Sequence, residues 1–193
     1  MEATAAREMR KTGQRALVGV LAGGAWIAWG VVLGDGIGLA VWVALMVVGG
    51  ILLFGCGYCI AKGIRWLGNT ESSGQGQVNK GFLLVIALEA AGVGGAIAAA
   101  QKLGRLEMLP IWIGIVIGLH FLGLAKVFRM AAYYATGVGM MLWCVAVWLF
   151  AWGEWRVVAT CLGIGVILWA TAAFNLYAVL SGERKAVAGF LQR

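Results

Sequence analysis

An acid and a histidine lie well inside the long apolar stretches of this chain. Glu89 is the only acid in such a stretch, and His120 is the only histidine among the 193 residues. A carboxylate and an imidazole brought together bind and release a proton near neutral pH, or hold a cationic or polar solute. The alternative is structural, with Glu89 protonated or hydrogen-bonded and His120 bonded to a backbone carbonyl.

Six further residues are predicted to complete this site. Thr171 and Asn175 are four residues apart and therefore share one helix face, from which Asn175 would orient the solute. Glu89, His120 and Asn175 fall at similar depths, in the inner halves of three apolar stretches. The residues predicted to line the cytoplasmic mouth are Lys126, Arg129, Tyr133 and Tyr134.

A second candidate motif is Cys56-Gly57-Tyr58-Cys59, a C-x-x-C. In soluble proteins this spacing indicates thiol redox chemistry or half of a zinc site. Here it falls at the predicted cytoplasmic end of an apolar stretch, where thiols stay reduced, and no second C-x-x-C completes a metal site. We interpret these cysteines as small apolar packing residues. A membrane thiol redox enzyme is the third functional hypothesis.

Most catalytic motifs are absent from the sequence. It has no H-E-x-x-H, no P-loop, no G-x-S-x-G and no cluster of acids. A single histidine also excludes most multi-histidine metal centres. We therefore expect no cofactor, no metal and no enzymatic activity.

Six apolar stretches must position these residues, and each is long enough to cross a hydrocarbon core of about 30 Å as a helix. The sequence is 62% hydrophobic and only 12% charged, about half the charged fraction of globular proteins. We predict an all-α, polytopic membrane protein with its six helices in a compact bundle. The predicted spans are Ala16–Leu33, Gly36–Ala61, Gly81–Ala100, Met108–Val127, Ala131–Trp152 and Trp155–Leu180.

Basic residues alternate with the spans and predict the topology. Twelve of the fifteen lie on one side, and only Lys102, Arg105 and Arg156 lie on the other. By the positive-inside rule both termini are cytoplasmic, and the net charge of +7 is a topology signal that does not indicate nucleic-acid binding. We expect a bacterial inner membrane protein with a basic N-terminal segment (1–15), a transmembrane domain (16–180) with a cytoplasmic loop (68–80), and a cytoplasmic tail (181–193).

Small residues four apart recur in the spans and predict close helix packing, within the chain or between copies in a homo-oligomer. These stripes are Gly19-x3-Gly23, Ala87-x3-Ala91-x3-Gly95, Gly114-x3-Gly118 and Ala135-x3-Gly139. Trp29-x4-Gly34-Asp35 also recurs as Trp148-x4-Gly153-Glu154, which suggests three related helical hairpins. A chance match over so few positions is the alternative.

The stretch from Gly118 to Phe128, followed by Tyr133 and Tyr134, resembles a segment of an uncharacterised family of small six-helix bacterial membrane proteins. In that family the segment has the form G-x-H-(F/L)-(L/P) before an aromatic and basic patch, with proline expected where this chain has Gly123. The resemblance implies that His120 and its neighbours form a recurring local feature, and it implies no activity.

Two functional classes follow. The first is a small transporter or channel-like protein, with a cytoplasm-facing polar pocket built on Glu89 and His120. The second is a structural or stress-related membrane bundle without transport activity.

Overall fold

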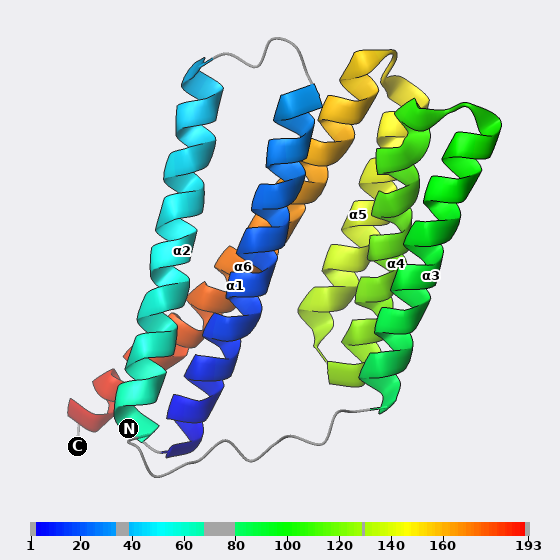
Figure 1. The fold of residues 1–193 in the computed structure, drawn as a ribbon. Coiled ribbons are helices and arrows are strands. Elements are labelled where there is room, and N and C mark those ends of the chain that lie inside the picture. The colour runs from blue at the N-terminus through cyan, green and yellow to red at the C-terminus, as the bar shows by residue number, and fades with distance from the viewer. Residues whose placement is uncertain (1–2, 34–38, 68–79, 129, 192–193) are drawn as a thin grey trace. The chain divides into compact units, whose positions relative to one another are not determined.

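The computed structural model describes residues 3–33, 39–67, 80–128 and 130–191, which form helices and short turns and contain no strand. Figure 1 shows six long helices, and each is long and apolar enough to span a membrane. The prediction of an all-α membrane protein with six transmembrane helices packed in a bundle is confirmed. The helices are α1 (Ala3–Leu33), α2 (Leu39–Leu67), α3 (Lys80–Leu103), α4 (Leu109–Phe128), α5 (Ala131–Phe150) and α6 (Glu154–Leu191).

The first and last helices extend beyond the predicted spans. α1 begins at Ala3 and runs through the basic segment that we placed before the first span, and α6 continues to Leu191. The predicted cytoplasmic loop (68–80), Gly34 and Asp35 of the hairpin repeat, and Arg129 fall outside the described residues, apart from Lys80, with which α3 begins. The hairpin repeat therefore stays a prediction.

Two glycines in the turns between helices have a left-handed backbone conformation that other residues rarely adopt. Gly104 has a φ of 63° after α3, where the N–H of Arg105 bonds back to the carbonyl of Ala100 at 3.0 Å. A single 3-10 turn, η2 (Leu106–Met108), then leads into α4. Gly153 has a φ of 57° between α5 and α6. These tight turns make α3 and α4, and likewise α5 and α6, neighbours along the chain with no room for a domain between them.

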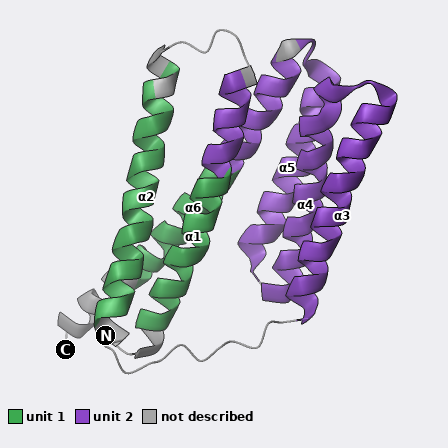
Figure 2. Cartoon of the chain, in the orientation of Figure 1, with its two compact units in different colours: residues 1–22, 38–75, 168–193 green, residues 23–37, 76–167 purple. Residues whose placement is uncertain are grey.

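The chain divides into two compact units, coloured separately in Figure 2. Unit 2 comprises residues 23–37 and 76–167, and therefore contains all of α3, α4 and α5. Within it α4 packs along both α3 and α5 (Figure 1). The backbones of α4 and α5 approach closely at Gly118 and Gly137, where a Cβ added to Gly137 would meet the Gly118 carbonyl oxygen at 2.6 Å.

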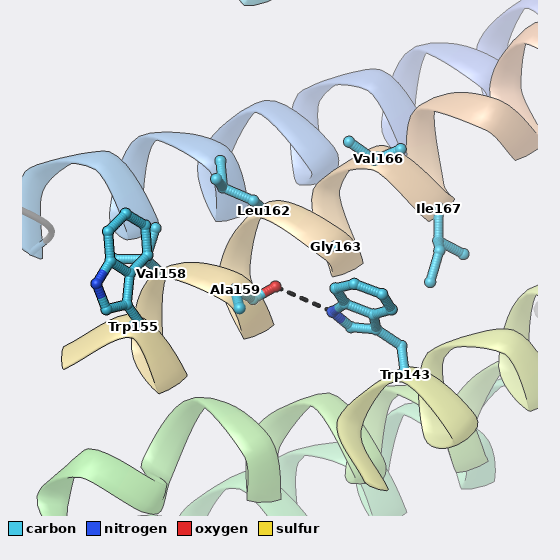
Figure 3. A pocket seen from close by; sticks show the side chains of 8 residues that line it. All are labelled: Trp143, Trp155, Val158, Ala159, Leu162, Gly163, Val166 and Ile167. Atoms are coloured by element: carbon cyan, nitrogen blue, oxygen red, sulfur yellow. Dashed lines mark hydrogen bonds between the residues drawn. The ribbon is translucent and has the colours of Figure 1, made fainter. Parts of the chain in front are cut away.

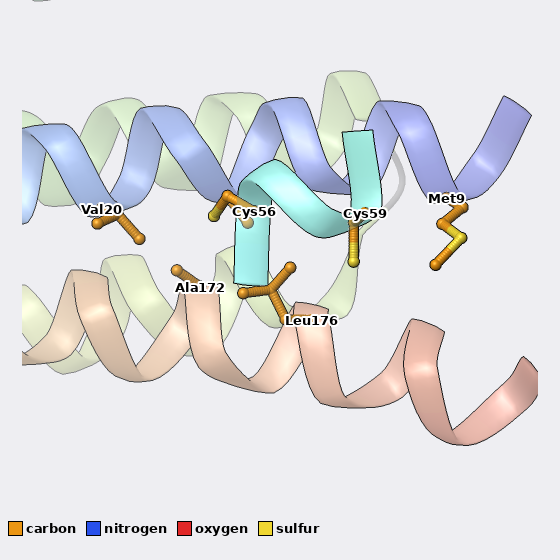
Figure 4. Close-up of a cluster of buried hydrophobic side chains, with 7 residues drawn as sticks. Met9, Val20, Cys56, Cys59, Ala172 and Leu176 are labelled. Atoms are coloured by element: carbon orange, nitrogen blue, oxygen red, sulfur yellow. The ribbon is translucent and has the colours of Figure 1, made fainter. Parts of the chain in front are cut away.

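Unit 1 comprises residues 1–22, 38–75 and 168–193, from α1, α2 and α6. Its core is apolar and rich in sulfur, with Met9, Cys56 and Cys59 buried beside Leu176 (Figure 4). The indole N–H of Trp169 donates a buried hydrogen bond to the Val20 carbonyl at 2.9 Å and so fixes α6 against α1 in this unit. An apolar core held by side chains from three helices is what a helical bundle requires.

The small-residue stripes divide into two groups. Gly114 and Gly118 pack tightly, because an added Cβ would lie 2.5 Å from Ile164 and 2.7 Å from Met141 respectively. By contrast, Gly95 in α3 and Gly139 in α5 have no atom within 4 Å of an added Cβ. Close packing by small residues is thus present in α4, while the stripes of α3 and α5 keep open positions in the part of the chain that the structure describes.

Candidate functional site

Glu89 and His120 lie in the middle of the seam between α3 and α4. On one side of them Val85 packs against Gly123, with an added Cβ 3.0 Å from the valine, and on the other Val116 packs against Gly92 at 2.7 Å. Residues 85, 89 and 92 share one face of α3, and 116, 120 and 123 share one face of α4, since both sets are spaced four and three apart. The two helices run antiparallel here, so the facing pairs follow in register. Along the seam, the Glu89–His120 pair is therefore flanked on both sides by apolar valine–glycine contacts.

The imidazole of His120 and the carboxylate of Glu89 lie close together. Nδ1 of His120 lies 3.1 Å from Oε2 of Glu89, with the imidazole side chain 9% exposed and the carboxylate side chain 28% exposed. Nδ1 is buried and makes no hydrogen bond of good geometry in the described residues, because the carboxylate oxygen is near it but out of line. A small side-chain rotation would turn this contact into a charge-assisted hydrogen bond.

This pair can carry one proton. With Glu89 ionised and His120 protonated the pair is neutral overall, and gain or loss of one proton changes its net charge by one. The imidazole is the shielded partner and the carboxylate is the more open one.

A chain of aromatic rings separates His120 from the ends of the helices that we predict to be cytoplasmic. Phe121 meets His120 edge-on, with centroids 5.9 Å apart, and Phe121 also meets Tyr133 at 5.6 Å. Phe128 then contacts both Tyr133 at 6.3 Å and Phe82 at 6.0 Å. These rings come from α3, α4 and α5, and they pack against one another on this side of the Glu89–His120 pair.

The other predicted site residues are dispersed. Tyr133 is buried within the aromatic chain, whereas Tyr134 and Lys126 are exposed, so the predicted mouth residues do not share one environment. Arg129 lies outside the described residues. Thr171 and Asn175 are half-buried in unit 1, while Glu89 and His120 belong to unit 2, where these two side chains make contact.

The cysteines are buried free thiols. Cys56 and Cys59 are fully buried in the core of unit 1, where Gly13 of α1 allows close approach to the Cβ of Cys59 and the carbonyl of Cys56 (Figure 4). Cys144 and Cys161 are fully buried too, and Gly114 packs on Cys144. All four occupy positions of small apolar residues in helix packing. No group of three or more histidines, cysteines or acids in the described residues could hold a metal.

One feature of unit 2 was not expected from the sequence. Trp143 of α5 lies directly over Gly163 of α6, and its indole N–H donates a hydrogen bond to the Ala159 carbonyl at 2.9 Å (Figure 3). An open groove of about 470 Å³ lies beside it on α6. Only the tertiary contact between two distant positions reveals this arrangement, since both spans are apolar on every side and show no contrasting stripe.

Comparison with known proteins gave no match to a family model, a curated protein or a solved structure. The resemblance of the Gly118–Tyr134 segment to a bacterial membrane protein family therefore stays a prediction.

Proposed function

We propose that this membrane protein is a small transporter or channel-like protein in which Glu89 and His120 bind and pass on a proton. The 3.1 Å contact between a carboxylate and an imidazole, at mid-helix in two membrane-spanning segments, carries the proposal. An ionisable pair in such a position is costly to bury, which makes a functional role its default explanation. Glu89 is the more exposed member of the pair, and in this proposal it exchanges the proton with the imidazole of His120.

A second candidate is a structural bundle in which the pair only joins α3 to α4. The glycine–valine contacts on both sides of the pair favour it, because they leave little space for a solute larger than a proton. For the same reason we limit the transport proposal to protons. The two candidates differ in whether the pair must exchange its proton with water.

Proton flux in liposomes tests the proposal. Wild-type protein, Glu89→Gln and His120→Gln would be reconstituted with an enclosed pH-sensitive dye, and an imposed pH difference would be followed as it decays. We expect decay at least tenfold slower in both variants than in wild type. Glu107→Gln is the matched control, since it removes an exposed carboxylate from η2 outside the seam.

Equal decay in wild type and Glu89→Gln would refute proton transfer through the pair. If Glu89→Gln were also less stable to unfolding than Glu107→Gln, the structural candidate would be the better account. A loss of flux in Glu107→Gln as well would show that the assay reports reconstitution and not the pair.

We also infer that the protein lies in a bacterial inner membrane with both termini cytoplasmic. Twelve of fifteen basic residues on one side of the six spans support this orientation. A fluorescent protein that matures only in the cytoplasm, fused after Arg193, should fluoresce. A reporter active only outside the cytoplasm should be inactive at that position, and the opposite result would reverse the topology.

A further inference from the structure

The groove on α6 follows a single stripe of the helix. Its lining residues on α6 run from Trp155 to Ile167 at spacings of three and four, and Trp143 of α5 forms one wall (Figure 3). Twelve residues of helix rise about 18 Å. One leaflet of a bilayer is about 15 Å thick in its hydrocarbon part. The groove is therefore as long as one extended lipid chain.

The walls of the groove are apolar. The polar side-chain atoms among its lining residues are the indole nitrogens of Trp143 and Trp155, and that of Trp143 already donates to the Ala159 carbonyl. The Trp143 indole also packs directly against Gly163, which has no room for a side chain. The indole is therefore held by this contact as well as by its hydrogen bond. A polar ligand would exchange its hydrogen bonds for contacts with an almost entirely apolar surface. A hydrocarbon chain has no hydrogen bonds to give up and is therefore the better fit to this groove.

A fixed positive charge lies near one end of the stripe. Arg156 follows Trp155 and shares the flank of α6 with Gly163 and Ile167, since these positions are seven and four residues apart. Its Nε donates to the Ala151 carbonyl at 3.2 Å, and its Nη1 lies 3.5 Å from the Met108 sulfur. A guanidinium has five N–H donors, so these two contacts orient the group and leave others for an anion.

We propose that the groove binds one phospholipid, with an acyl chain along α6 between Trp155 and Ile167 and the phosphate at Arg156. The positive charge of Arg156 suits the phosphate, and the apolar groove suits the acyl chain. The length of the groove is close to the hydrocarbon thickness of one leaflet, and a bilayer around the six spans would supply the lipid. This site is separate from the Glu89–His120 pair and does not depend on the proton proposal.

Native mass spectrometry of delipidated protein in detergent, after addition of dioleoyl phosphatidylglycerol, tests the site. Val166→Trp would fill the groove, and Val145→Trp is the matched control, because the two valines are 51% and 44% exposed and only Val166 lines the groove. We expect wild type and Val145→Trp to retain one lipid through detergent exchange. Val166→Trp should bind it at least tenfold more weakly.

The headgroup is tested with dioleoylglycerol, which has the same chains and no phosphate. Wild type should prefer phosphatidylglycerol at least tenfold, and Arg156→Gln should abolish the preference without abolishing chain binding. Equal lipid retention in Val166→Trp and wild type would overturn the acyl-chain site, and an unchanged preference in Arg156→Gln would overturn the phosphate contact. A lipid-free dimer that Val166→Trp dissociates would show that a second copy occupies the groove, and would also overturn the proposal.

Discussion

The two faces of α4 make different kinds of contact. Towards α5 the two backbones meet at Gly118 and Gly137, with the side chains of Leu122 and Met141 beside them. Towards α3 the helices meet through side chains, with valines set into Gly92 and Gly123 and the Glu89–His120 contact between them. The centre of the first contact is backbone, which cannot rotate away, while the second is made by side chains that can rotate.

This difference indicates which helix can respond to a change in charge. The Glu89–His120 contact lies in the α3–α4 seam, so a change in the charge of this pair would act first across that seam. We therefore expect α4 and α5 to act as a rigid pair, against which α3 shifts. Three experiments would break or sharpen this contrast.

The largest effect is expected at the backbone contact. Gly137→Val places a branched side chain where even a Cβ would lie 2.6 Å from the Gly118 carbonyl, so the helices must separate. We expect the free energy of unfolding to fall by about 3 kcal/mol, as for severe overpacking. Titration with SDS in mixed micelles measures it.

Gly139→Val is the control for that substitution. Gly139 lies on the same helix as Gly137, but a Cβ added to it has no atom within 4 Å. It should change the unfolding free energy by less than about 0.5 kcal/mol, as surface substitutions do. Similar losses in both variants would show that the effect belongs to valine in α5 and not to the contact with α4.

An intermediate effect is expected for the ion pair. A double-mutant cycle with Glu89→Gln, His120→Gln and the double variant should give a coupling free energy of about 1 kcal/mol, typical of polar contacts between membrane helices. Zero coupling would mean that the 3.1 Å approach contributes nothing to the seam.

The smallest effect is expected where valine meets glycine on the α3 side. Gly123→Ala brings a Cβ to 3.0 Å from Val85, whose side chain can give way, so the cost should be only about 0.5 kcal/mol. Val85→Ala should restore the loss when the two substitutions are combined. A cost as large as that of Gly137→Val would refute the contrast between the two faces of α4.

Much of the architecture follows from the sequence. Length and apolar composition predict the six helices, and the predicted boundaries of the four central spans agree with those of α2 to α5 within a few residues, apart from the longer C-terminal end of α2. The helical course of residues 3–15 and 181–191 was not predicted, because span prediction detects apolar runs and a polar helix gives no such signal. Of the candidate site, the Glu89–His120 contact was predicted from their depth and from the short turn between spans.

Other features depend on contacts between distant positions. Asn175 was placed near the pair by depth alone; it belongs to unit 1 and His120 to unit 2, so its place beside the pair stays a prediction. Depth fixes a residue's height in the bilayer, whereas its neighbours depend on which helices pack together and how each is rotated. The Trp143–Gly163 contact and its groove depend on both, and neither leaves a mark in a uniformly apolar sequence.

The sequence by itself determined that six helices cross a membrane and that one acid and one histidine lie at matching depths, because hydrophobic length and charge are local properties of the chain. Only the tertiary structure decided that the Glu89 and His120 side chains face each other, that glycines of α4 and α5 let the two backbones approach closely, and that α6 carries an apolar groove. Those features depend on helix rotation, which in this chain is set by the fit of side chains into glycine positions and not by any contrast between polar and apolar faces.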